Sequence, residues 1–254
     1  MRIEETVDMR ISVCMTTFNG EKYLPEQLAS IVGQLQPCDE LIISDDSSTD
    51  STVSIIESLH DSRIKLLRGN RFYNPIYNFE NALKQAKGEV IALSDQDDIW
   101  LENKLSVIRH HFQEKPPGIF TLVLDGCIID DQGAVVCNSI FDTIGSCKGI
   151  LKNLYDNTYM GCSMAFSREL LSIALPFPKG IPMHDSWLGL LTECFGTVEF
   201  VQEETIKYRR HSSNKSFQKF RVSQQVSWRC FLAYHLFKRW LTRSCMRSGR
   251  SGGA

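Results

Sequence analysis

The stretch NFENALKQAKGEVIALSDQDDIW, residues 78–100, predicts a helix, a buried strand and an acidic turn in direct succession. Residues 78–86 have a helical pattern, and Gly88 follows as a residue type that commonly ends a helix. Residues 89–93 form a short apolar run, as expected of a buried strand. The strand is followed at once by three acids, Asp95, Asp97 and Asp98.

The segments around this unit repeat the alternation of strands and helices. Strands are predicted at residues 10–17, 40–44 and 63–67, and helices at 23–34, 53–59 and 101–112. Such alternation predicts an α/β fold, a Rossmann-like, mostly parallel sheet flanked by helices. Ligands of such sheets bind beyond the carboxyl ends of the strands. Polar clusters lie at three of these ends, residues 16–19, 45–47 and 95–98, so the sequence predicts one binding crevice there.

The pattern is less regular after Pro117. Further elements are expected in this half: strands at 118–125 and 161–166, a hairpin near 133–136, and helices near 169–175 and at 184–195. The Pro-rich residues 176–182 are expected to form a loop. We therefore expect one sheet-based domain with a second, less repetitive half.

Charge is distributed unevenly along the 254 residues. All 30 acidic residues lie at or before Glu204, whereas 12 of the 28 Lys/Arg follow it, so residues 1–204 carry a formal net charge of −14. An acidic body repels nucleic acid, and no nucleic-acid-binding motif is present. A basic tail of this kind usually meets phosphate groups.

Several features predict a cytoplasmic protein. Residues 1–10 are charged and lack the apolar core of a signal peptide. No stretch approaches the roughly 20 apolar residues needed to span a bilayer. The nine cysteines show no metal-ligand spacing and suit reduced thiols.

The acidic turn at residues 95–98 is a candidate metal site. Closely spaced carboxylates repel one another unless a cation lies among them, and oxygen ligands suit Mg²⁺ or Mn²⁺. The alternative is that these acids cap the helix that follows, because a helix N-terminus favours negative charge. Asp98 in particular suits that role.

Ordered motifs across residues 10–214 resemble the family 2 glycosyltransferases, which have the GT-A fold. ISVCMTTFNGEKYLPEQLASI is similar to the opening strand, nucleotide loop and helix of that family. DELIISDDSSTDST resembles its V-D-D-G-S-x-D segment, with Ser47 where Gly is commoner. Residues 78–98 resemble its N-x-x-x-A-x-x-x-A-x-G run ending in D-x-D-D, and YRRHSSN, residues 208–214, its Y-R-x-H-x-x-N.

The resemblance implies a nucleotide-sugar site with a divalent ion, Mn²⁺ or Mg²⁺. Asp97 would bind the ion, and Asp95 would share ribose and metal. The residues implied to bind the nucleotide sugar are Thr16, Phe18, Asp45, Asp46, Asp95, Gln96, Arg209 and His211. Phe18 stands where Tyr is frequent, which keeps a stacking face but loses a hydroxyl.

The resemblance also implies that Asp185, in PMHDSWLG, is the general base of an inverting single displacement. The alternative is that Asp185 caps the helix that follows. His184, Trp187 and Gly161 are implied on the acceptor side, although Trp187 fits a core position equally well. The relatives of this pattern imply transfer of a hexose or deoxyhexose, from dTDP-rhamnose or a UDP-hexose, to a lipid-linked or oligosaccharide acceptor in bacterial O-antigen or capsule synthesis.

We predict a GT-A catalytic domain over residues 1–214, divided into a nucleotide-sugar half (1–115) and an acceptor half (116–214). A basic aromatic helical extension is predicted over 215–246, and a disordered tail over 247–254. The helical line of Trp228, Leu232, Leu236 and Trp240 predicts peripheral binding to an anionic membrane, on the inner face of the plasma membrane. A helix packed on the domain or a dimer interface fits the same pattern equally well. The rival enzyme class is a nucleotidyltransferase or another metal-dependent nucleotide-sugar enzyme, although MTTFNGEKY lacks the Gly-rich phosphate loop of the former.

Overall fold

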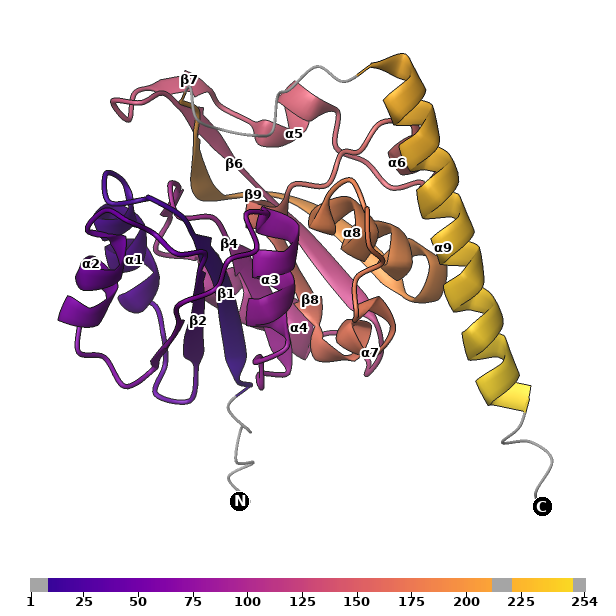
Figure 1. The fold of residues 1–254 in the computed structure, drawn as a ribbon, viewed down its shortest axis with the longest axis horizontal. Coiled ribbons are helices and arrows are strands. Elements are labelled where there is room, and N and C mark those ends of the chain that lie inside the picture. Colours follow the sequence, from indigo (N-terminus) through magenta and orange to yellow (C-terminus); the bar gives the residue numbers. More distant parts are fainter. Residues whose placement is uncertain (1–8, 212–220, 249–254) are drawn as a thin grey trace.

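The computed structural model describes residues 9–211 and 221–248. Its central feature is one mixed sheet of nine strands in the described residues, in the order β3-β2-β1-β4-β8-β6-β9-β5, with β7 paired to β6 (Figure 1). The strands are β1 Ile11–Thr17, β2 Glu40–Asp45, β3 Ile64–Leu67, β4 Val90–Ser94, β5 Ile99–Trp100, β6 Phe120–Ile129, β7 Val135–Cys137, β8 Met164–Ser167 and β9 Thr197–Arg209.

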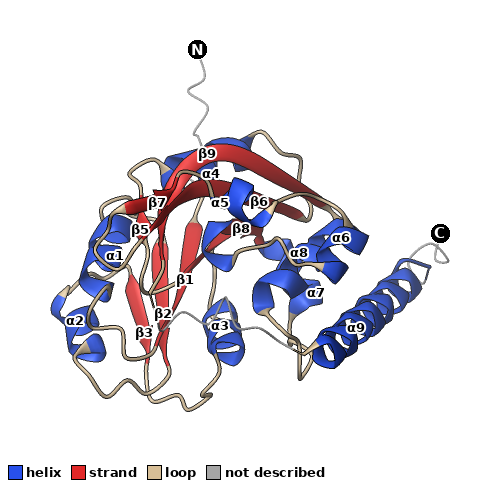
Figure 2. Ribbon diagram, turned by 90° about the horizontal axis from the view of Figure 1, so that it is seen from above, coloured by secondary structure: helices blue, strands red, loops and turns tan. Residues whose placement is uncertain are grey.

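Helices cover both faces of this sheet (Figures 1 and 2). The α-helices are α1 Leu24–Val32, α2 Thr52–Ser58, α3 Pro75–Leu83, α4 Lys104–Gln113, α5 Ile140–Ile144, α6 Ile150–Tyr155, α7 Leu171–Ala174, α8 His184–Phe195 and α9 Val222–Ser248. One core cluster joins α1, α2 and α4 to one sheet face, through side chains such as Val13 and Leu28. A second joins α3, α7 and α8 to the other face, through side chains such as Phe79 and Leu190.

Strands β1 to β4 are parallel and form the Rossmann-like half that the sequence predicts. Their apolar runs are buried along their whole length in β1, β2 and β4, because both faces lie under helices. The hairpin predicted near 133–136 is present as β7 paired to β6. The prediction of an α/β, mostly parallel GT-A sheet flanked by helices, with a C-terminal helical extension, is confirmed.

Several elements differ from the predictions. β9 was not predicted, because its three glutamates obscure the apolar pattern, yet it pairs in parallel with β6 along most of its length and antiparallel with β5. The strand expected at 161–166 begins with a 3-10 turn, Gly161–Ser163, and β8 then runs antiparallel to β4 and β6. The helix expected at 78–86 begins at Pro75, since the Asn74 side chain accepts a hydrogen bond from Ile76 N, 2.9 Å, and caps it.

The carboxyl-terminal boundary also differs from the prediction. α9 continues to Ser248, so it extends into the tail predicted at 247–254. Residues 212–220 and 249–254 lie outside the described residues, and so do the predictions made for them, including Ser212–Asn214 of the YRRHSSN motif. The eight cysteines whose side chains are described are free thiols. Among the described helices, none combines the length and the apolar composition that crossing a bilayer requires.

Candidate active site

The acidic loop, Asp95–Asp98, connects β4 to β5 at the carboxyl edge of the parallel strands. Gln27 of α1 fixes its start, because Gln27 Nε2 donates to Asp95 O at 3.1 Å and to Ser94 Oγ at 2.8 Å. Asp98 is fully buried, and its Oδ1 accepts a hydrogen bond from Arg209 N at 3.0 Å. α4 begins only at Lys104, with Asn103 as its N-cap, so the alternative that Asp98 caps this helix is wrong.

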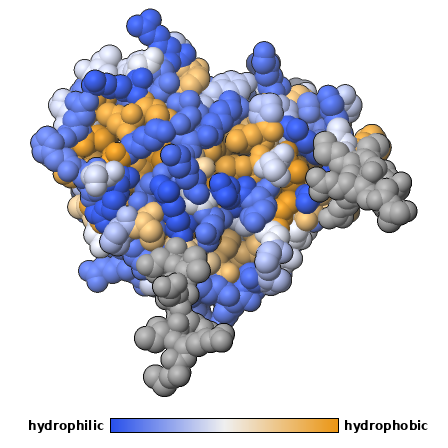
Figure 3. All heavy atoms as spheres, turned by 90° about the horizontal axis from the view of Figure 1, so that it is seen from below, coloured by the Kyte–Doolittle hydropathy of each residue, from blue (hydrophilic) through white to orange (hydrophobic). Residues whose placement is uncertain are grey.

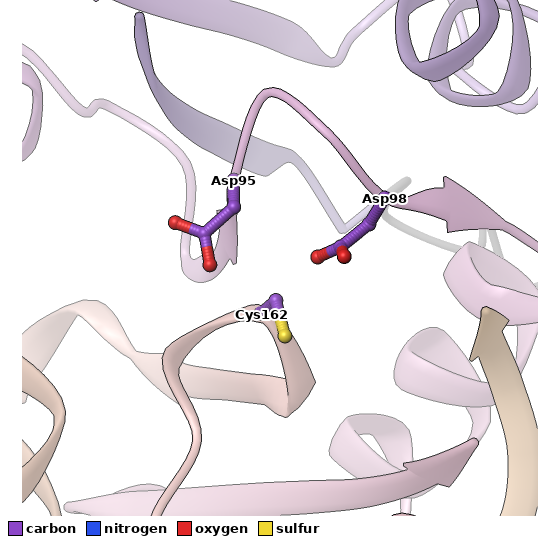
Figure 4. Close-up of side chains that lie close together, drawn as sticks. All are labelled: Asp95, Asp98 and Cys162. Atoms are coloured by element: carbon purple, nitrogen blue, oxygen red, sulfur yellow. The ribbon is translucent and has the colours of Figure 1, made fainter. Parts of the chain in front are cut away.

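Asp95 and Asp98 face a common space together with Cys162 of the 3-10 turn (Figure 4). One ligand atom from each of the three side chains lies within 4.8 Å of the others. Asp98 Oδ2 is buried and has no hydrogen-bond partner in the described part of the chain. Two carboxyl groups this close, one with an orphaned oxygen, are a donor set that suits a hard cation.

Burial and mutual repulsion disfavour the charged form of both carboxyl groups. Burial, then Asp97, then Asp185 raise the pKa of Asp95 to about 7. Burial, with repulsion from Asp97 and Asp95, raises the pKa of Asp98 well above its usual range. Burial also raises the pKa of the Cys162 thiol, and a neutral sulfur is a poor ligand for Mg²⁺ or Mn²⁺. The carboxylates, and not the thiol, are therefore the candidate ligands.

Lys104 places a cation beneath this acidic loop. Its side chain is almost fully buried, its Nζ donates to Cys162 O at 2.6 Å, and the same Nζ lies 4.5 Å from the ring centroid of Trp100. Burial lowers the pKa of Lys104 to about 8, opposed by the charges of Asp98 and Asp95. The sequence analysis missed this residue, because a lysine at the start of a helix resembles any solvated surface charge.

Asp97, between Asp95 and Asp98 in the acidic loop, contacts His211. Its Oδ2 lies 2.8 Å from His211 Nε2, and the His211 ring stacks on Tyr23 with centroids 4.8 Å apart. The Arg209 side chain links the acidic loop to α1. Its Nε donates to Asp97 O at 3.0 Å, and its Nη2 donates to the Glu26 carboxylate at 2.7 Å. The structure thus brings the predicted Asp97, Arg209 and His211 together.

The loop after β1 is joined to the acidic loop by Gln96. Gln96 Oε1 accepts a hydrogen bond from Phe18 N at 2.9 Å, and Gln96 Nε2 donates to Phe18 O at 3.1 Å. The Phe18 ring is 51% exposed, whereas Thr16 is nearly buried. Gln96 is therefore engaged with the backbone of the predicted base pocket, and the face of Phe18 is open to a ligand.

Asp45, the last residue of β2, and Asp46, which follows it, accept hydrogen bonds from other groups of the protein. Asp45 accepts hydrogen bonds from Thr17 Oγ1 at 2.9 Å and from Ser48 N at 2.9 Å. Asp46 accepts from the backbone N–H groups of Phe72 at 2.6 Å and Asn74 at 3.2 Å, which holds the loop before α3. Ser47, directly after Asp46, has a φ of +61°. This backbone conformation favours glycine, which explains why Gly is common at this position in the family that the sequence resembles.

Asp185 lies in the first turn of α8 and is nearly buried. Met183 is the N-cap of α8, so the alternative that Asp185 is the N-cap is wrong. Its Oδ1 accepts from Ser186 N at 2.5 Å and from Asn157 Nδ2 at 3.4 Å. Burial raises the pKa of Asp185 to about 6, against these hydrogen bonds. Its charge also contributes to the raised pKa of Asp95, so the two carboxyl groups share one electrostatic site.

His184 and Gly161 lie beside Asp185. The His184 ring is buried and stacks on Phe79 with centroids 4.1 Å apart, and burial lowers its pKa to about 3. Neither of its ring nitrogens has a hydrogen-bond partner within residues 9–211 and 221–248. A Cβ at Gly161 would lie 2.9 Å from His184 Nε2, so this position needs glycine. The two residues form a close contact at the predicted acceptor side.

Trp187, which the resemblance implies on the acceptor side, lies in the core instead. Its side chain is fully buried, and its Nε1 donates to Ala174 O at 3.1 Å. Trp187 therefore fills the core between α7 and α8, which is the other role that the sequence left open. The sequence analysis also missed Asn157 and Gln27, which position Asp185 and Asp95 from distant segments that no local motif marks.

Comparison with known proteins gives the same picture. A sequence profile described as "Glycosyl transferase family 2" matches residues 12–171. The Escherichia coli protein WfgD, a "UDP-Glc:alpha-D-GlcNAc-diphosphoundecaprenol beta-1,3-glucosyltransferase", is 36% identical over 100 residues, which is 39% of this chain and 40% of WfgD. The Shigella flexneri dTDP-rhamnosyl transferase RfbG is 40% identical over 98 residues, 36% of this chain and 34% of RfbG. The chain thus matches about two fifths or less of the length of these relatives.

The fold is shared with a protein of known structure. Staphylococcus aureus TarS, residues 1–349 in complex with UDP-GlcNAc, superposes with a TM-score of 0.71 at 21% identity and covers 89% of this chain and 66% of that one. At such identity the likeness concerns the fold alone, whereas the profile spans more than half of the sequence. The chain belongs to glycosyl transferase family 2.

Proposed function

We propose that this protein is a metal-dependent, inverting glycosyltransferase. It moves a hexose or deoxyhexose from a nucleoside-diphosphate sugar to a hydroxyl of a sugar acceptor. The observation that carries the proposal is the pairing of the acidic loop with Asp185: Asp95 follows β4 and Asp185 lies in α8, yet the charge of Asp185 contributes to the raised pKa of Asp95. A donor phosphate site and a base would then lie close to each other in one active site.

Asp95 and Asp97 would hold the divalent ion, Mn²⁺ or Mg²⁺, and Asp98, whose Oδ2 has no hydrogen-bond partner among the described residues, would add a third carboxylate beside Asp95. Burial first, and repulsion from Asp97 second, raise the pKa of Asp95, and this supports the assignment because a cation would relieve the repulsion. His211 contacts Asp97 and would therefore lie beside the ion and the pyrophosphate. When bound, the ion would neutralise the negative charge that grows on the departing nucleoside diphosphate.

Asp185 would act on the acceptor. With a pKa of about 6, the carboxyl group is ionised near neutral pH yet more basic than an ordinary aspartate. It takes the proton of the acceptor hydroxyl as that oxygen bonds to the anomeric carbon. The bond from that carbon to the phosphate oxygen breaks on the opposite face, and its electron pair leaves with the nucleoside diphosphate.

The remaining residues orient the two substrates. The exposed ring of Phe18, with Thr16 beside it, suits a nucleotide base and ribose, and Asp45 lies behind them at the end of β2. The ring nitrogens of His184 have no hydrogen-bond partner among the described residues, and its pKa is far below neutrality, so the ring offers a neutral donor or acceptor to a sugar hydroxyl. By likeness to WfgD and RfbG, the donor is a UDP-hexose or dTDP-rhamnose, and the acceptor is a lipid-diphosphate-linked sugar of O-antigen or capsule synthesis.

A thermal-shift panel tests the proposal. UDP-glucose, UDP-galactose, UDP-GlcNAc and dTDP-rhamnose are each added with Mn²⁺, with Mg²⁺ or with EDTA. We expect one nucleotide family to raise the melting temperature only with metal, since a ligand at 100 times its Kd adds about 2.7 kcal/mol to the free energy of unfolding. The stabilising donor is then incubated with lipid-diphosphate-linked acceptors, and the anomeric configuration of the product is read by NMR.

Three outcomes would contradict the proposal. Stabilisation by no nucleotide or nucleotide sugar would remove the donor site. Release of pyrophosphate from a nucleoside triphosphate and a sugar phosphate would indicate the nucleotidyltransferase class. Retention of the anomeric configuration would remove the role of Asp185 as a base in single displacement.

A further inference from the structure

The last helix, α9, lies at the edge of the molecule along α6 and α8 (Figures 1 and 2). Leu232 and Leu236 pack into the core on its inner side. Three of its cationic side chains, Arg229, Arg239 and Arg243, also turn toward the body: Arg229 donates to Tyr155 O at 2.8 Å, Arg239 to Pro176 O at 2.7 Å, and Arg243 lies 5.2 Å from the Phe195 ring centroid. The packing role that the sequence left open for this helix is therefore present.

The opposite side of α9 carries a second apolar face, which we call the outer stripe. Its large members are Val226, Tyr234, Phe237, Trp240 and Leu241, which are 44% to 61% exposed. Their spacing of three, four, seven and eight residues places them on one side of a helix. Trp240, which the sequence analysis placed on the line of Leu232 and Leu236, belongs to this outer side and is 51% exposed.

Exposed apolar side chains gather at this edge of the molecule. Of the twelve most exposed large hydrophobic side chains in the described residues, five form the outer stripe, and two more, Leu151 and Tyr155, lie on the adjoining α6. Arg229 joins the two helices, because its guanidinium lies 4.3 Å from the Tyr155 ring centroid. The face seen in Figure 3 alternates hydrophobic and hydrophilic areas, and hydrophobic atoms are visible beside the grey carboxyl-terminal residues, where α9 ends.

The charge around the outer stripe has one sign. The sequence of α9 contains Arg229, Lys238, Arg239, Arg243 and Arg247 and no Asp or Glu. Three of these arginines turn toward the body, whereas Lys238 is exposed next to the stripe. A second copy of α9 on this stripe would bring Lys238 against a helix that has no acid to pair with it. Anionic phospholipid headgroups would instead complement this lysine, and Trp and Tyr are side chains that favour a membrane interface.

We propose that the outer stripe of α9 is the surface by which this protein lies on an anionic phospholipid bilayer. α9 packs against α8, which carries Asp185 in its first turn, so the bilayer lies on the acceptor side of the molecule. A lipid-diphosphate acceptor held in that bilayer would then meet the base, whereas the donor enters from the β1–β4 half. The acceptor part of this inference rests on the proposed function.

Vesicle flotation of the full chain tests the inference. The double variant Phe237→Ser/Trp240→Ser removes the centre of the outer stripe without touching the inner packing. The matched control is Val135→Ser/Val136→Ser, which removes two side chains on β7 that are 54% and 59% exposed. We expect the original chain and the control to float with vesicles of phosphatidylglycerol and phosphatidylcholine. The α9 variant should bind them at least tenfold more weakly, as should Lys238→Glu.

Donor binding separates this inference from the proposed function. All variants should keep the metal-dependent thermal shift with the nucleotide sugar, and the α9 variant should lose transfer only to acceptors presented in vesicles. Equal flotation of the α9 variant and the control, or equal binding to neutral and anionic vesicles, would overturn the inference. A concentration-dependent dimer that Phe237→Ser/Trp240→Ser abolishes would assign the stripe to a second copy of the chain instead. If the original chain bound vesicles but no nucleotide-sugar donor, the result would contradict the proposed function but not the membrane-binding surface.

Discussion

The acids at the end of β2 and those after β4 have similar sequence contexts but different environments. Asp45 and Asp46 accept hydrogen bonds from side chains and backbone N–H groups of their own chain. Asp95 and Asp98 are pressed together under burial, and Asp98 keeps an oxygen without a hydrogen-bond partner in the described residues. The first pair stabilises loops, whereas the second costs stability unless a cation joins it.

Asp185 resembles the second pair more than the first. It is buried and its pKa is raised, although backbone N–H groups and Asn157 partly compensate it. Carboxyl groups whose hydrogen bonds are all made within the protein stabilise its loops. Buried carboxyl groups with incomplete hydrogen bonding are available to a ligand. This contrast can be tested by substitutions in both sets of acids.

The largest expected effect follows from Asp185→Asn. Because the amide cannot take a proton, we expect transfer to fall by about 10²- to 10⁴-fold, while the nucleotide sugar still stabilises the protein. Single-turnover transfer and thermal shift measure the two properties. Asp142→Asn, the same change at an exposed carboxyl group, is the control and should keep full activity. Near-normal transfer by Asp185→Asn would place Asp185 with the structural acids.

A smaller effect should separate Asp46 from Asp98. Asp46→Asn replaces an oxygen that accepts a backbone N–H by an NH₂ group, so we expect the free energy of unfolding to fall by about 1–3 kcal/mol. Asp98→Asn keeps an Oδ1 for Arg209 N and removes a buried charge that Asp95 and Asp97 repel. Its loss, measured by urea unfolding in EDTA, should be smaller. Equal losses would remove the distinction between the two strand ends.

The pH dependence should show the same contrast. Transfer is expected to fall about tenfold per unit once the pH drops below the Asp185 pKa of about 6, because the protonated acid cannot act as a base. A rate profile that stays flat down to pH 5 would contradict this role.

Stability without metal should change in the opposite sense. The folded-state pKa values of Asp185 and Asp95, about 6 and about 7, exceed the usual 3.8, so their contribution is full below about pH 4 and is lost as pH rises through these values. His184 opposes this below pH 6.5, because its pKa is lowered from 6.5 to about 3. Above pH 6.5 this opposition ends, and the free energy of unfolding in EDTA should fall to about pH 7, above which the lowered pKa of Lys104, about 8, acts in the opposite sense. A rise over that interval would contradict the raised pKa of Asp95.

The sequence predicted the parts of this molecule that depend on local pattern. β1, β2 and β4 are short apolar runs followed by polar turns, and the acidic loop lies where one of these runs ends. β9 escaped prediction because its partner β6 lies far away in the chain and its own sequence is rich in charge. A strand of that kind is defined by its neighbours more than by its residues.

The environment of single side chains could not be predicted for a related reason. The sequence places Lys104 at a helix start, but only the fold puts its Nζ on Cys162 O beneath the acidic loop. Along α9, two apolar lines occur on one helix, and only packing on α8 decides that Leu232 and Leu236 face inward while Trp240 faces outward. Bonds between distant segments decide which of several chemically similar residues are free for a ligand.

The hydrogen bonds between Gln96 and Phe18 have a consequence for how this site can diverge. A Cβ on Gly20 would lie 2.4 Å from Gln96 Oε1, so any side chain at position 20 displaces the Gln96 amide from its present place. That displacement would release both backbone bonds of Phe18 and with them the ring that is open to the base. A substitution at position 20 would therefore alter the base pocket through position 96, and the two positions should vary together among descendants of this sequence.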